Sequence, residues 1–490
     1  MPAPDSAAVE ARRLRVHIGG WRGDAPAGSD ELRNPADIRE IVAIVPGCDR
    51  AAAEEAIVVA ASGAAVWAGA SALERGRVLA RAAALVEERS EELATAMTLE
   101  MGKVIAESRV EVQRTVEILR FFSQAPKLQD GATFPLAGSR ESAFTLRVPL
   151  GTVGLITPWN FPLMIPAWKT AAALAFGNAV VLKPAALAPL SATALVECLL
   201  GAGLPAEAIS LVPGQGSVVG AALVESERVA AISFTGSTEV GTQIARRAAE
   251  PGKRVQCEMG GRNALVVLAD ADLEAAVESI VLAGFGSAGQ RCTSSSRVIV
   301  QRAVAEELTE RLVAAVRELR VGPGLDPASM VGPVVSAAAL RDVEGALARA
   351  SREGAEILVG GGRYRGEGCE HGHFLEPTVT RGSPPDGWFA GHEVFGPVVS
   401  LIEADDLDEA IRLNNSVRYG LSSGIYTRDL EAAMRFVHET DTGMVHVNRP
   451  TVGAEPHIPF GGAKESSIGP PEMGDAWQFF TRSRSAHVRW

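Results

Sequence analysis

The sequence predicts an α/β protein built on the doubly wound plan, in which helices cover both faces of a mostly parallel sheet. Short apolar runs alternate with helical segments from residue 153 to 258, and a second alternating region extends from 265 to about 447. This alternation is typical of parallel sheets that bind nucleotides at the C-terminal ends of their strands. The chain of 490 residues is long enough for two or three domains, and its hydrophobic fraction of 47% is ordinary for a globular protein.

Helical periodicity dominates the first part of the chain. It covers 51–70, 73–102 and 105–124, with a break at Gly102-Lys103 before the last segment. From 130 to 148 the pattern alternates and is punctuated by glycine and proline, which predicts a β-hairpin.

Strands and helices then follow one another to residue 258. Strands are expected at 153–157, 179–183, 209–212, 230–235 and 254–258, and helices at 165–175, 191–201, 218–225 and 236–250. The second region contains a long charged helix at 303–319 and a glycine-rich segment at 354–368, and the tail ends in an expected edge strand at 485–490.

Charge and cysteine usage narrow the class of protein. The formal net charge of −12 argues against nucleic acid or an anionic membrane surface as the main partner, and solubility accounts for that charge. The five cysteines are odd in number and widely spread, which fits free thiols in a reducing compartment. The N-terminus lacks the apolar run of a signal peptide. We therefore expect a cytoplasmic protein with neither nucleic acid nor a membrane as partner.

Cys292 is the candidate nucleophile. It lies among small and polar residues in Gly289-Gln290-Arg291-Cys292-Thr293-Ser294, between a helical pattern and a β-rich run. Little packs around a cysteine in such a junction, whereas nearby backbone N–H groups can lower its pKa and stabilise an oxyanion. An inert small residue is the alternative.

Two glycine patterns could bind a dinucleotide. The stretch 284–289 matches G-x-G-x-x-G but follows a helix, so we interpret it as close backbone packing beside Cys292. Gly214-Gln215-Gly216 follows a strand and precedes a helix, which leaves it open between a cofactor contact and an ordinary turn.

The stretch 234–241 is better placed for a phosphate. A strand ends at Phe234-Thr235, Gly236 makes the turn, and Ser237 and Thr238 start a helix whose free N–H groups favour an anion. An ordinary N-cap is the alternative. Lys183, at the end of a neighbouring strand, would supply a cation to a phosphate or ribose and so favours the cofactor.

Glu258 is the candidate general base. It ends a strand and precedes Met259-Gly260-Gly261, and its apolar neighbours would raise its pKa. A salt-bridged boundary residue is the alternative. A thiol, a carboxylate base and a phosphate-binding sheet together suggest thioester chemistry coupled to hydride transfer.

These residues belong to an ordered set of motifs. They are Thr157-Pro158-Trp159-Asn160-Phe161-Pro162, 234–241, Glu258-Met259-Gly260-Gly261, Gly289-Gln290-Arg291-Cys292, Glu393-Val394-Phe395-Gly396-Pro397 and Pro459-Phe460-Gly461-Gly462-Ala463-Lys464. In this set and order the chain resembles the aldehyde dehydrogenase superfamily over essentially its whole length. The resemblance implies oxidation of a small-molecule aldehyde to an acid with NAD or NADP.

The resemblance implies a role for each site residue. Cys292 would attack the aldehyde, Asn160 and the Cys292 backbone N–H would hold the oxyanion, Glu258 would activate water, and Lys169 would relay a proton. The implied cofactor residues are Ile156, Thr157, Pro158, Trp159, Lys183, Ala186, Gly216, Phe234, Gly236, Ser237, Glu258, Gly260, Glu393 and Phe395. Ser237, Trp159 and Lys183 would contact the pyrophosphate and adenosine side, Glu393 the nicotinamide ribose, and Phe395 would pack near the nicotinamide.

The chain departs from the family's pattern at three places. Ala186 stands where NAD-preferring members often have a glutamate, so we expect use of both cofactors or tolerance of NADP. Arg262 replaces a lysine. Ser466-Ser467 replaces the usual Ser-Gly, and 469–474 is like the branch that includes ketoglutarate-semialdehyde dehydrogenases.

The resemblance places Phe161, Met164, Ile165 and Trp168 along the aldehyde tunnel, with core packing as the alternative for one or two of them. An apolar tunnel favours aliphatic or aromatic aldehydes. A buried arginine at Arg449, or less favourably Arg291, would instead bind the carboxylate of a semialdehyde acid, whereas a salt bridge is the bland interpretation of Arg449. Cys369-Glu370-His371-Gly372-His373 is interpreted as a solvated loop, so no metal site is expected.

The implied domains are a cofactor-binding domain (1–125 and 150–257), a catalytic domain (258–447), a β oligomerisation element (126–149 and 478–490) and a substrate-loop segment (448–477) that returns to the cofactor domain. A homodimer or homotetramer is expected. A CoA-acylating relative is the first alternative, which Glu258 disfavours. A non-catalytic binding protein on the same fold is the second, which Cys292, Asn160 and Glu258 disfavour.

Overall fold

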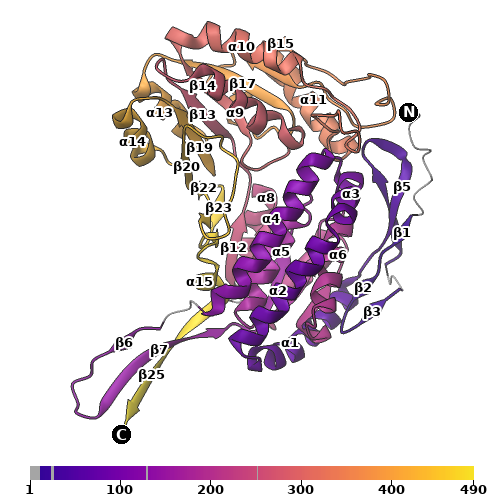
Figure 1. The fold of residues 1–490 in the computed structure, drawn as a ribbon, viewed down its shortest axis with the longest axis vertical. Helices are drawn as coiled ribbons and strands as arrows, with labels where there is room; N and C mark the ends of the chain where they lie inside the picture. The colour runs from indigo at the N-terminus through magenta and orange to yellow at the C-terminus, as the bar shows by residue number, and fades with distance from the viewer. Residues whose placement is uncertain (1–10, 24–26, 128–130, 251) are drawn as a thin grey trace.

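The computed structural model describes residues 11–23, 27–127, 131–250 and 252–490. Two large sheets form the body, and a narrow β arm projects from it at the lower left of Figure 1.

The first sheet has eight strands in the order β23-β12-β11-β8-β9-β10-β2-β3. Their bounds are β2 (Val16–His17), β3 (Trp21–Arg22), β8 (Thr152–Ile156), β9 (Ala179–Lys183), β10 (Ile209–Leu211), β11 (Val229–Thr235), β12 (Arg254–Glu258) and β23 (Ser467–Ile468). Strands β8 to β12 are mutually parallel, whereas β2 and β23 pair antiparallel with β10 and β12.

Helices cover both faces of this sheet, as the sequence predicts. One face carries α1 (Arg50–Gly69), α7 (Ala221–Glu225) and α8 (Thr238–Ala249), and the other α2 (Ala72–Glu88), α3 (Ser90–Met101), α4 (Ile105–Gln124), α5 (Met164–Ala175) and α6 (Pro189–Gly201). Alternate residues of one strand point to opposite faces. Val180 and Leu182 therefore join the core under α2 to α6, whereas Val181 joins the core under α1. Because both faces of this sheet are buried, the sequences of its central strands are continuous apolar runs.

Helix α1 is the one described helix that is long and apolar enough to cross a membrane. Its buried side is made of small residues and Trp67, and it packs on β9 and β10 inside the protein. Because a core helix passes the same length test, α1 is explained by this packing.

The strand order reverses between β8 and β11, where doubly wound sheets form a crevice at the C-terminal ends of the strands. From β8 the chain continues to β9 and β10 on one side, and then crosses over to β11 and β12 on the other. Ligands of doubly wound sheets bind where the order reverses in this way.

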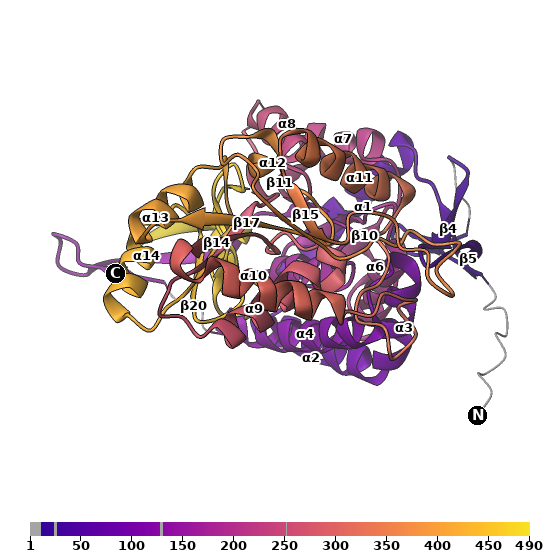
Figure 2. The ribbon, with the colours of Figure 1, turned by 90° about the horizontal axis from the view of Figure 1, so that it is seen from above.

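The second sheet has seven strands in the order β15-β16-β17-β14-β13-β19-β20. Their bounds are β13 (Asn263–Val267), β14 (Ser295–Gln301), β15 (Glu356–Val359), β16 (Thr378–Arg381), β17 (Val398–Ala404), β19 (Ser422–Tyr426) and β20 (Met444–Val447). Its helices are α9 (Leu273–Phe285), α10 (Ala305–Arg317), α11 (Ala337–Arg352), α12 (Trp388–Gly391), α13 (Leu407–Asn415) and α14 (Leu430–Glu439). Figure 2 shows this unit from above, with α9 and α10 on one side of the strands and α13 and α14 toward the end that carries the arm.

The arm is the three-stranded sheet β25-β7-β6, made of β6 (Thr133–Phe134), β7 (Glu141–Pro149) and β25 (Thr481–Arg489). Strands β7 and β25 pair antiparallel over their whole length. The smaller elements are β1 (Arg12–Arg13), β4 (Ser29–Asn34), β5 (Asp37–Pro46), β18 (Tyr419–Gly420), β21 (Pro459–Phe460), β22 (Ala463–Lys464), β24 (Glu472–Met473) and α15 (Ala476–Phe480).

The predicted fold class is confirmed, and four local expectations need correction. The helix expected over 73–102 is two helices that meet at Arg89. The helix expected from 218 is preceded by a π-helical turn over Gly216–Gly220. The final strand begins at Thr481, before residue 485, and the sheet of β1, β4 and β5 was not predicted. The hairpin expected from 130 is present as β6 and β7, and its first residue lies outside the described ranges.

Gly63 tests the packing of α1 against the short helical turn Ala206–Ala208 that precedes β10. A Cβ at Gly63 would lie 2.2 Å from the carbonyl oxygen of Glu207, so Gly63→Ala must force the backbones apart. We expect it to cost about 1–3 kcal/mol and to lower the thermal unfolding midpoint. Gly69→Ala, in the same helix, is the matched control because its Cβ would meet no atom within 4 Å. Equal midpoints for the two variants would contradict the packing.

Candidate active site

Cys292 lies in a tight turn between α9 and β14. The turn over Gly286–Gly289 places Ser287 and Ala288 at φ of 51° and 53°, in the left-handed region that side chains rarely adopt. Glu107 of α4 offsets this strain, because its carboxylate accepts hydrogen bonds from the backbone N–H of Ser287 at 2.7 Å and from Arg291 at 2.7 Å. The glycines of 284–289 serve close packing, as predicted: a Cβ at Gly289 would lie 2.0 Å from the carbonyl oxygen of Gly396.

The backbone of Cys292 is fixed by the start of the second sheet. The side-chain amide of Asn263 donates to the Cys292 carbonyl at 2.7 Å and to the Ser294 carbonyl at 2.9 Å. A Cβ at Gly261 would lie 2.6 Å from the same Cys292 carbonyl, so this approach requires glycine. The nucleophile is thus placed by its backbone, which leaves the side chain facing the cavity.

Asn160 lies against this turn. It follows β8, it is buried, and its amide donates to the carbonyl of Gln290 at 3.1 Å. The structure therefore places the Asn160 amide on the turn that carries Cys292, the residue with which the resemblance pairs it for an oxyanion.

A buried ion pair holds the loop that carries Asn160. Lys103 and Glu111 are each 1% exposed and bond to each other. The Lys103 ammonium also donates to the Asn160 carbonyl at 2.9 Å, and the second Glu111 oxygen accepts from the N–H groups of Leu163 and Met164 at 3.0 Å. The ammonium and both carboxylate oxygens therefore have hydrogen-bond partners, which a buried ion pair requires.

Glu258 ends β12 beside a second buried ion pair. Its Oε2 accepts a hydrogen bond from Ser467 at 2.7 Å, and its Oε1 has no partner among the described residues. Lys169 bonds to Glu472 and donates to Ser233 at 2.7 Å. Lys169 therefore lies near Glu258, but Glu472 is its direct carboxylate partner.

Burial raises the pKa of Glu258 well above the usual value, and the nearby Glu472 carboxylate raises it further. A general base works best when its pKa is near the working pH, so this direction suits the predicted role.

The pKa of Cys292 does not follow the sequence expectation. Burial, and then the Glu393 and Glu258 carboxylates, raise it to about 12, and these effects outweigh the backbone N–H groups that were expected to lower it. In the ligand-free protein the sulfur is therefore a thiol, which must lose its proton as the reaction proceeds.

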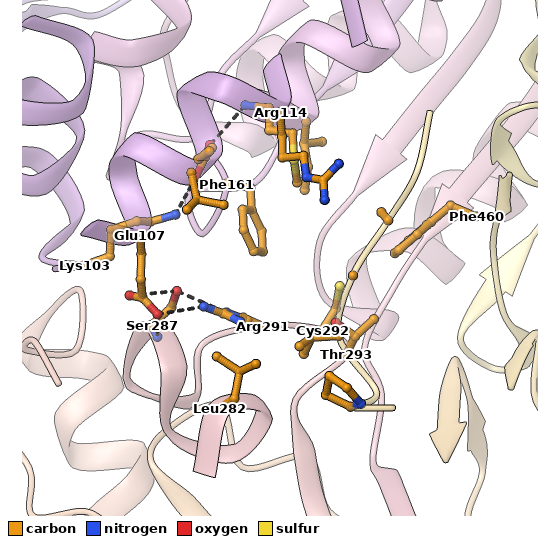
Figure 3. A pocket seen from close by; sticks show the side chains of 18 of the residues that line it. Lys103, Glu107, Arg114, Phe161, Leu282, Ser287, Arg291, Cys292, Thr293 and Phe460 are labelled. Carbon is orange, nitrogen blue, oxygen red and sulfur yellow. Dashed lines mark hydrogen bonds and ion pairs between the residues drawn. The ribbon is translucent and has the colours of Figure 1, made fainter. Parts of the chain in front are cut away.

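A cavity of about 400 Å³ ends at Cys292 (Figure 3). Phe161, Met164, Ile165 and Trp168 all line it, and two of them, Ile165 and Trp168, are also buried in the core of the first unit. Its other lining residues include Lys103, Glu107, Glu111, Arg114, Leu282, Arg291, Thr293, Val452 and Phe460. The walls are mainly apolar, with a band of charges contributed by α4 and Arg291.

Arg449 does not lie in the cavity, contrary to its candidacy as a carboxylate-binding residue. It is exposed and is not among the residues that line the cavity. Asn448 before it has φ of 53° and bonds to Thr427, and Pro450 after it does line the cavity, so the Arg449 side chain alone is excluded. Arg291, the weaker candidate, does line the cavity.

The crevice at the ends of β8 and β11 has unsatisfied polar groups. The hydroxyls of Thr157, Thr235 and Thr238 are buried and have no hydrogen-bond partner among the described residues. Ser237 is the N-cap of α8 but makes no side-chain cap bond, unlike an ordinary N-cap. Lys183 donates to the Pro184 carbonyl at 2.9 Å, and burial lowers its pKa to about 8. These donors fit the phosphates and ribose of a dinucleotide.

Glu393 and Phe395 complete this edge. Glu393 accepts from the Gly261 N–H at 2.8 Å, and burial raises its pKa to about 7. A Cβ at Gly260 would lie 2.2 Å from the Glu393 carboxylate, which explains that glycine. The rings of Phe395 and Trp159 pack edge to face, with 5.5 Å between their centroids.

The remaining cofactor candidates lie along the same crevice. Ile156 ends β8 and Pro158 follows it, Phe234 and Gly236 end β11, and Gly216 and Ala186 are exposed. Cys369, interpreted as part of a solvated loop, is buried against Ala36 and Phe374.

The charged face of α4 was not predicted from the sequence, and neither were Ser467 and Glu472 as partners of Glu258 and Lys169. Glu107, Glu111 and Arg114 recur at helical spacing after Lys103, and this periodicity was the available signal. The sequence contains no local signal for the contacts of Glu472 and Ser467, because these residues are more than 200 positions from the groups they bind.

Comparison with known proteins decides the family. Residues 21–486 match the model of the aldehyde dehydrogenase family. The chain belongs to that family. It is 38% identical over 472 residues to the alpha-ketoglutaric semialdehyde dehydrogenase of Bacillus subtilis, with 96% of this chain and 97% of that protein covered. It is 42% identical over 461 residues to the 2,5-dioxopentanoate dehydrogenase of Saccharolobus solfataricus, with 93% and 95% covered.

Solved structures agree. The betaine aldehyde dehydrogenase of Staphylococcus aureus in complex with NAD+ is 30% identical, matches with a TM-score of 0.94, and covers 97% of this chain and 95% of that one. The resemblance to this family, and to its ketoglutarate-semialdehyde branch, is therefore confirmed. This aldehyde dehydrogenase is an NAD(P)-dependent oxidoreductase that converts an aldehyde to a carboxylic acid.

The raised pKa of Cys292 predicts how the free enzyme reacts with iodoacetamide. Only the thiolate is alkylated, and the pKa is about 12, so labelling should accelerate about tenfold per pH unit up to pH 10 without a plateau. Mass spectrometry of the Cys292 peptide measures the rate, and Cys292→Ala identifies background labelling. A plateau near pH 7 would show instead that the resting sulfur is ionised.

Proposed function

We propose that this aldehyde dehydrogenase oxidises a semialdehyde acid, using Cys292 as nucleophile, Asn160 as oxyanion donor and Glu258 as general base. The observation that most directly supports this proposal is that Arg114, Arg291 and Cys292 line the same cavity. An aldehyde at the sulfur and a carboxylate at a guanidinium would occupy its two ends.

The first half of the reaction makes the thioester. The Cys292 sulfur gives up its proton to water and bonds to the aldehyde carbon, and the carbonyl π electrons move to the oxygen, which becomes an oxyanion held by the Asn160 amide and the Cys292 N–H. Bound NAD(P)+ supplies the acceptor for the hydride of that carbon, which leaves the acyl group on Cys292 as a thioester.

The second half releases the acid. Glu258 takes a proton from water, the hydroxide adds to the thioester carbon, and the C–S bond breaks to leave the acid and the Cys292 thiolate. The raised pKa of Glu258 supports this role. The Lys169–Glu472 pair lies beside the carboxylate, and we infer that Lys169 assists proton removal through Glu472, its direct partner.

The cofactor lies, in this proposal, along the crevice of the first sheet. The unpaired hydroxyls of Thr157 and Thr235, together with Ser237 and Lys183, would hold its phosphates and ribose, and Glu393 the nicotinamide ribose. Ala186 is exposed and carries no charge that would repel a 2′-phosphate, so we infer that both NAD and NADP are used.

The substrate class follows from the charged band of the cavity. Arg114 donates through one nitrogen to Glu117 at 2.7 Å and to Glu455 at 3.4 Å, which leaves its other nitrogens without a partner in the described chain. Arg291 is partly engaged by Glu107. A guanidinium with free donors binds a carboxylate in fork geometry. The names of the two relatives describe one compound, a 2-oxo acid with an aldehyde at its far end. We infer a substrate of this kind.

We also infer a homodimer or homotetramer in the cytoplasm. The β arm projects from the body, and its edge strand β25 carries exposed Val488, so it offers main-chain groups for pairing. All five cysteines lie in the described residues and are free, which supports a reducing compartment.

Glu258→Gln tests the mechanism. With NAD or NADP and a semialdehyde acid, the variant should form about one equivalent of reduced nicotinamide per site, because hydride transfer precedes hydrolysis. Its steady-state rate should then fall at least about 100-fold, as loss of a general base predicts. Stopped-flow absorbance measures both phases. Cys292→Ala should show neither phase, and steady turnover by Cys292→Ala would refute the nucleophile.

Arg114→Gln tests the substrate class. We expect kcat/KM for 2,5-dioxopentanoate to fall about 10- to 100-fold, because a charge-assisted contact is lost, with little change for an uncharged aldehyde of similar length. Arg109→Gln is the matched control, since Arg109 lies on the same helix but bonds to Glu91 outside the cavity. Equal losses for the two aldehydes would contradict a carboxylate site at Arg114.

A further inference from the structure

Ser467 is the side chain that contacts the Glu258 carboxylate. Strand β23 pairs antiparallel with β12, and in this register Ser467 lies directly opposite Glu258. Its hydroxyl donates to Glu258 Oε2 at 2.7 Å. The contact thus joins the last residue of β12 to a strand that arrives more than 200 positions later.

The direction of this hydrogen bond follows from the carboxylate. An ionised carboxylate only accepts, so the Ser467 hydroxyl gives its proton to Glu258, while its Oγ accepts from the Gly462 N–H at 2.7 Å. A chain that runs from N–H through hydroxyl to carboxylate strengthens each bond in it. Glycine, the usual residue at this place in the family's motif, could not make such a chain.

Glu258 has little else to stabilise its charge. Four ionisable groups of the described chain interact with it: Lys169 of α5, Glu472 of β24, Cys292, and the adjacent Cys257 of β12. The one cation, the Lys169 ammonium, bonds to Glu472 and Ser233. Glu258 Oε1 has no partner in the described chain, and a Cβ at Gly461 would lie 3.2 Å from it. The carboxylate is 2% exposed, so water does not compensate.

We propose that Ser467 is a positioning residue that holds the Glu258 carboxylate at the edge of β12 and keeps it ionised between turnovers. This inference rests on the proposed role of Glu258 as the general base. Glu258 is not among the residues that line the aldehyde cavity, and docking on Ser467 accounts for where its side chain lies. The hydroxyl favours the charged form of the base, opposing burial and the repulsion from Glu472.

The test is the pH dependence of thioester hydrolysis in Ser467→Ala. The steady rate after the burst, divided by the burst amplitude, reports hydrolysis per competent site and does not depend on how much protein is folded. This rate falls as the pH drops through the pKa of Glu258, because a protonated carboxyl cannot take a proton from water. Removing the hydroxyl raises that pKa, so the midpoint of the acid limb should move up by about one pH unit.

Two further variants separate the hydroxyl from the fold of β23. Ser467→Thr keeps the donor and should return the midpoint to the wild-type pH. Ser466→Ala should leave it there, because the neighbouring serine donates to the Gly260 carbonyl at 2.7 Å and contacts neither carboxylate.

The outcomes are distinct. A superimposable profile for Ser467→Ala would overturn the proposal, as would equal shifts in all three serine variants, since these would reflect a general disturbance of the strand. Glu258→Gln is measured in parallel. If it turns over normally, the proposed function fails, whereas loss of hydrolysis in Glu258→Gln with an unshifted Ser467→Ala removes the role of Ser467 alone.

Discussion

The position of the reactive groups depends on the buried face of α4. Lys103, just before this helix, and Glu111 within it form an ion pair that is almost fully removed from water and whose remaining bonds go to the Asn160 loop. One turn from Glu111, Glu107 holds the strained turn before Cys292. Asn160 follows a strand of the first sheet and Cys292 precedes a strand of the second. One helix therefore sets the distance between groups that belong to different sheets.

Burying this charge is costly, and its retention has a physical reason. An apolar pair of similar volume would be at least as stable in many proteins, but it would offer no ammonium to a carbonyl and no carboxylate to two N–H groups. Here the pair substitutes for the secondary structure that the 160–163 loop, just before α5, lacks. Removing one partner would leave a charge unpaired in the interior and release the loop, so stability and catalysis are coupled at these two residues.

The sequence located the chemistry where strands end, because that signal is local. A strand that closes on Glu258, a lysine at the end of the 179–183 run and a cysteine between helix and strand can each be identified within a few residues. The failures concern what lies across the fold. The resemblance made Arg449 a candidate for the substrate's carboxylate, with a salt bridge as the alternative, yet the residue is exposed and does not line the cavity. The pKa of Cys292 was expected to fall, but the sign is decided by burial and by Glu393, which lies about a hundred residues away. Ser467 stood out only as a departure from the family's pattern until its register opposite Glu258 gave it a partner.

The arrangement around Cys292 separates the two halves of the reaction in space. The aldehyde cavity is bounded by α4, α5 and the turn before Cys292, whereas Glu258 and Glu393 belong to the crevice beyond Gly260 and Gly261. Both carboxylates raise the pKa of the thiol, so the side of the sulfur that faces them is negative. A cofactor carrying a positively charged nicotinamide would offset that field when bound, and a resting thiol with a pKa of about 12 would then ionise more easily.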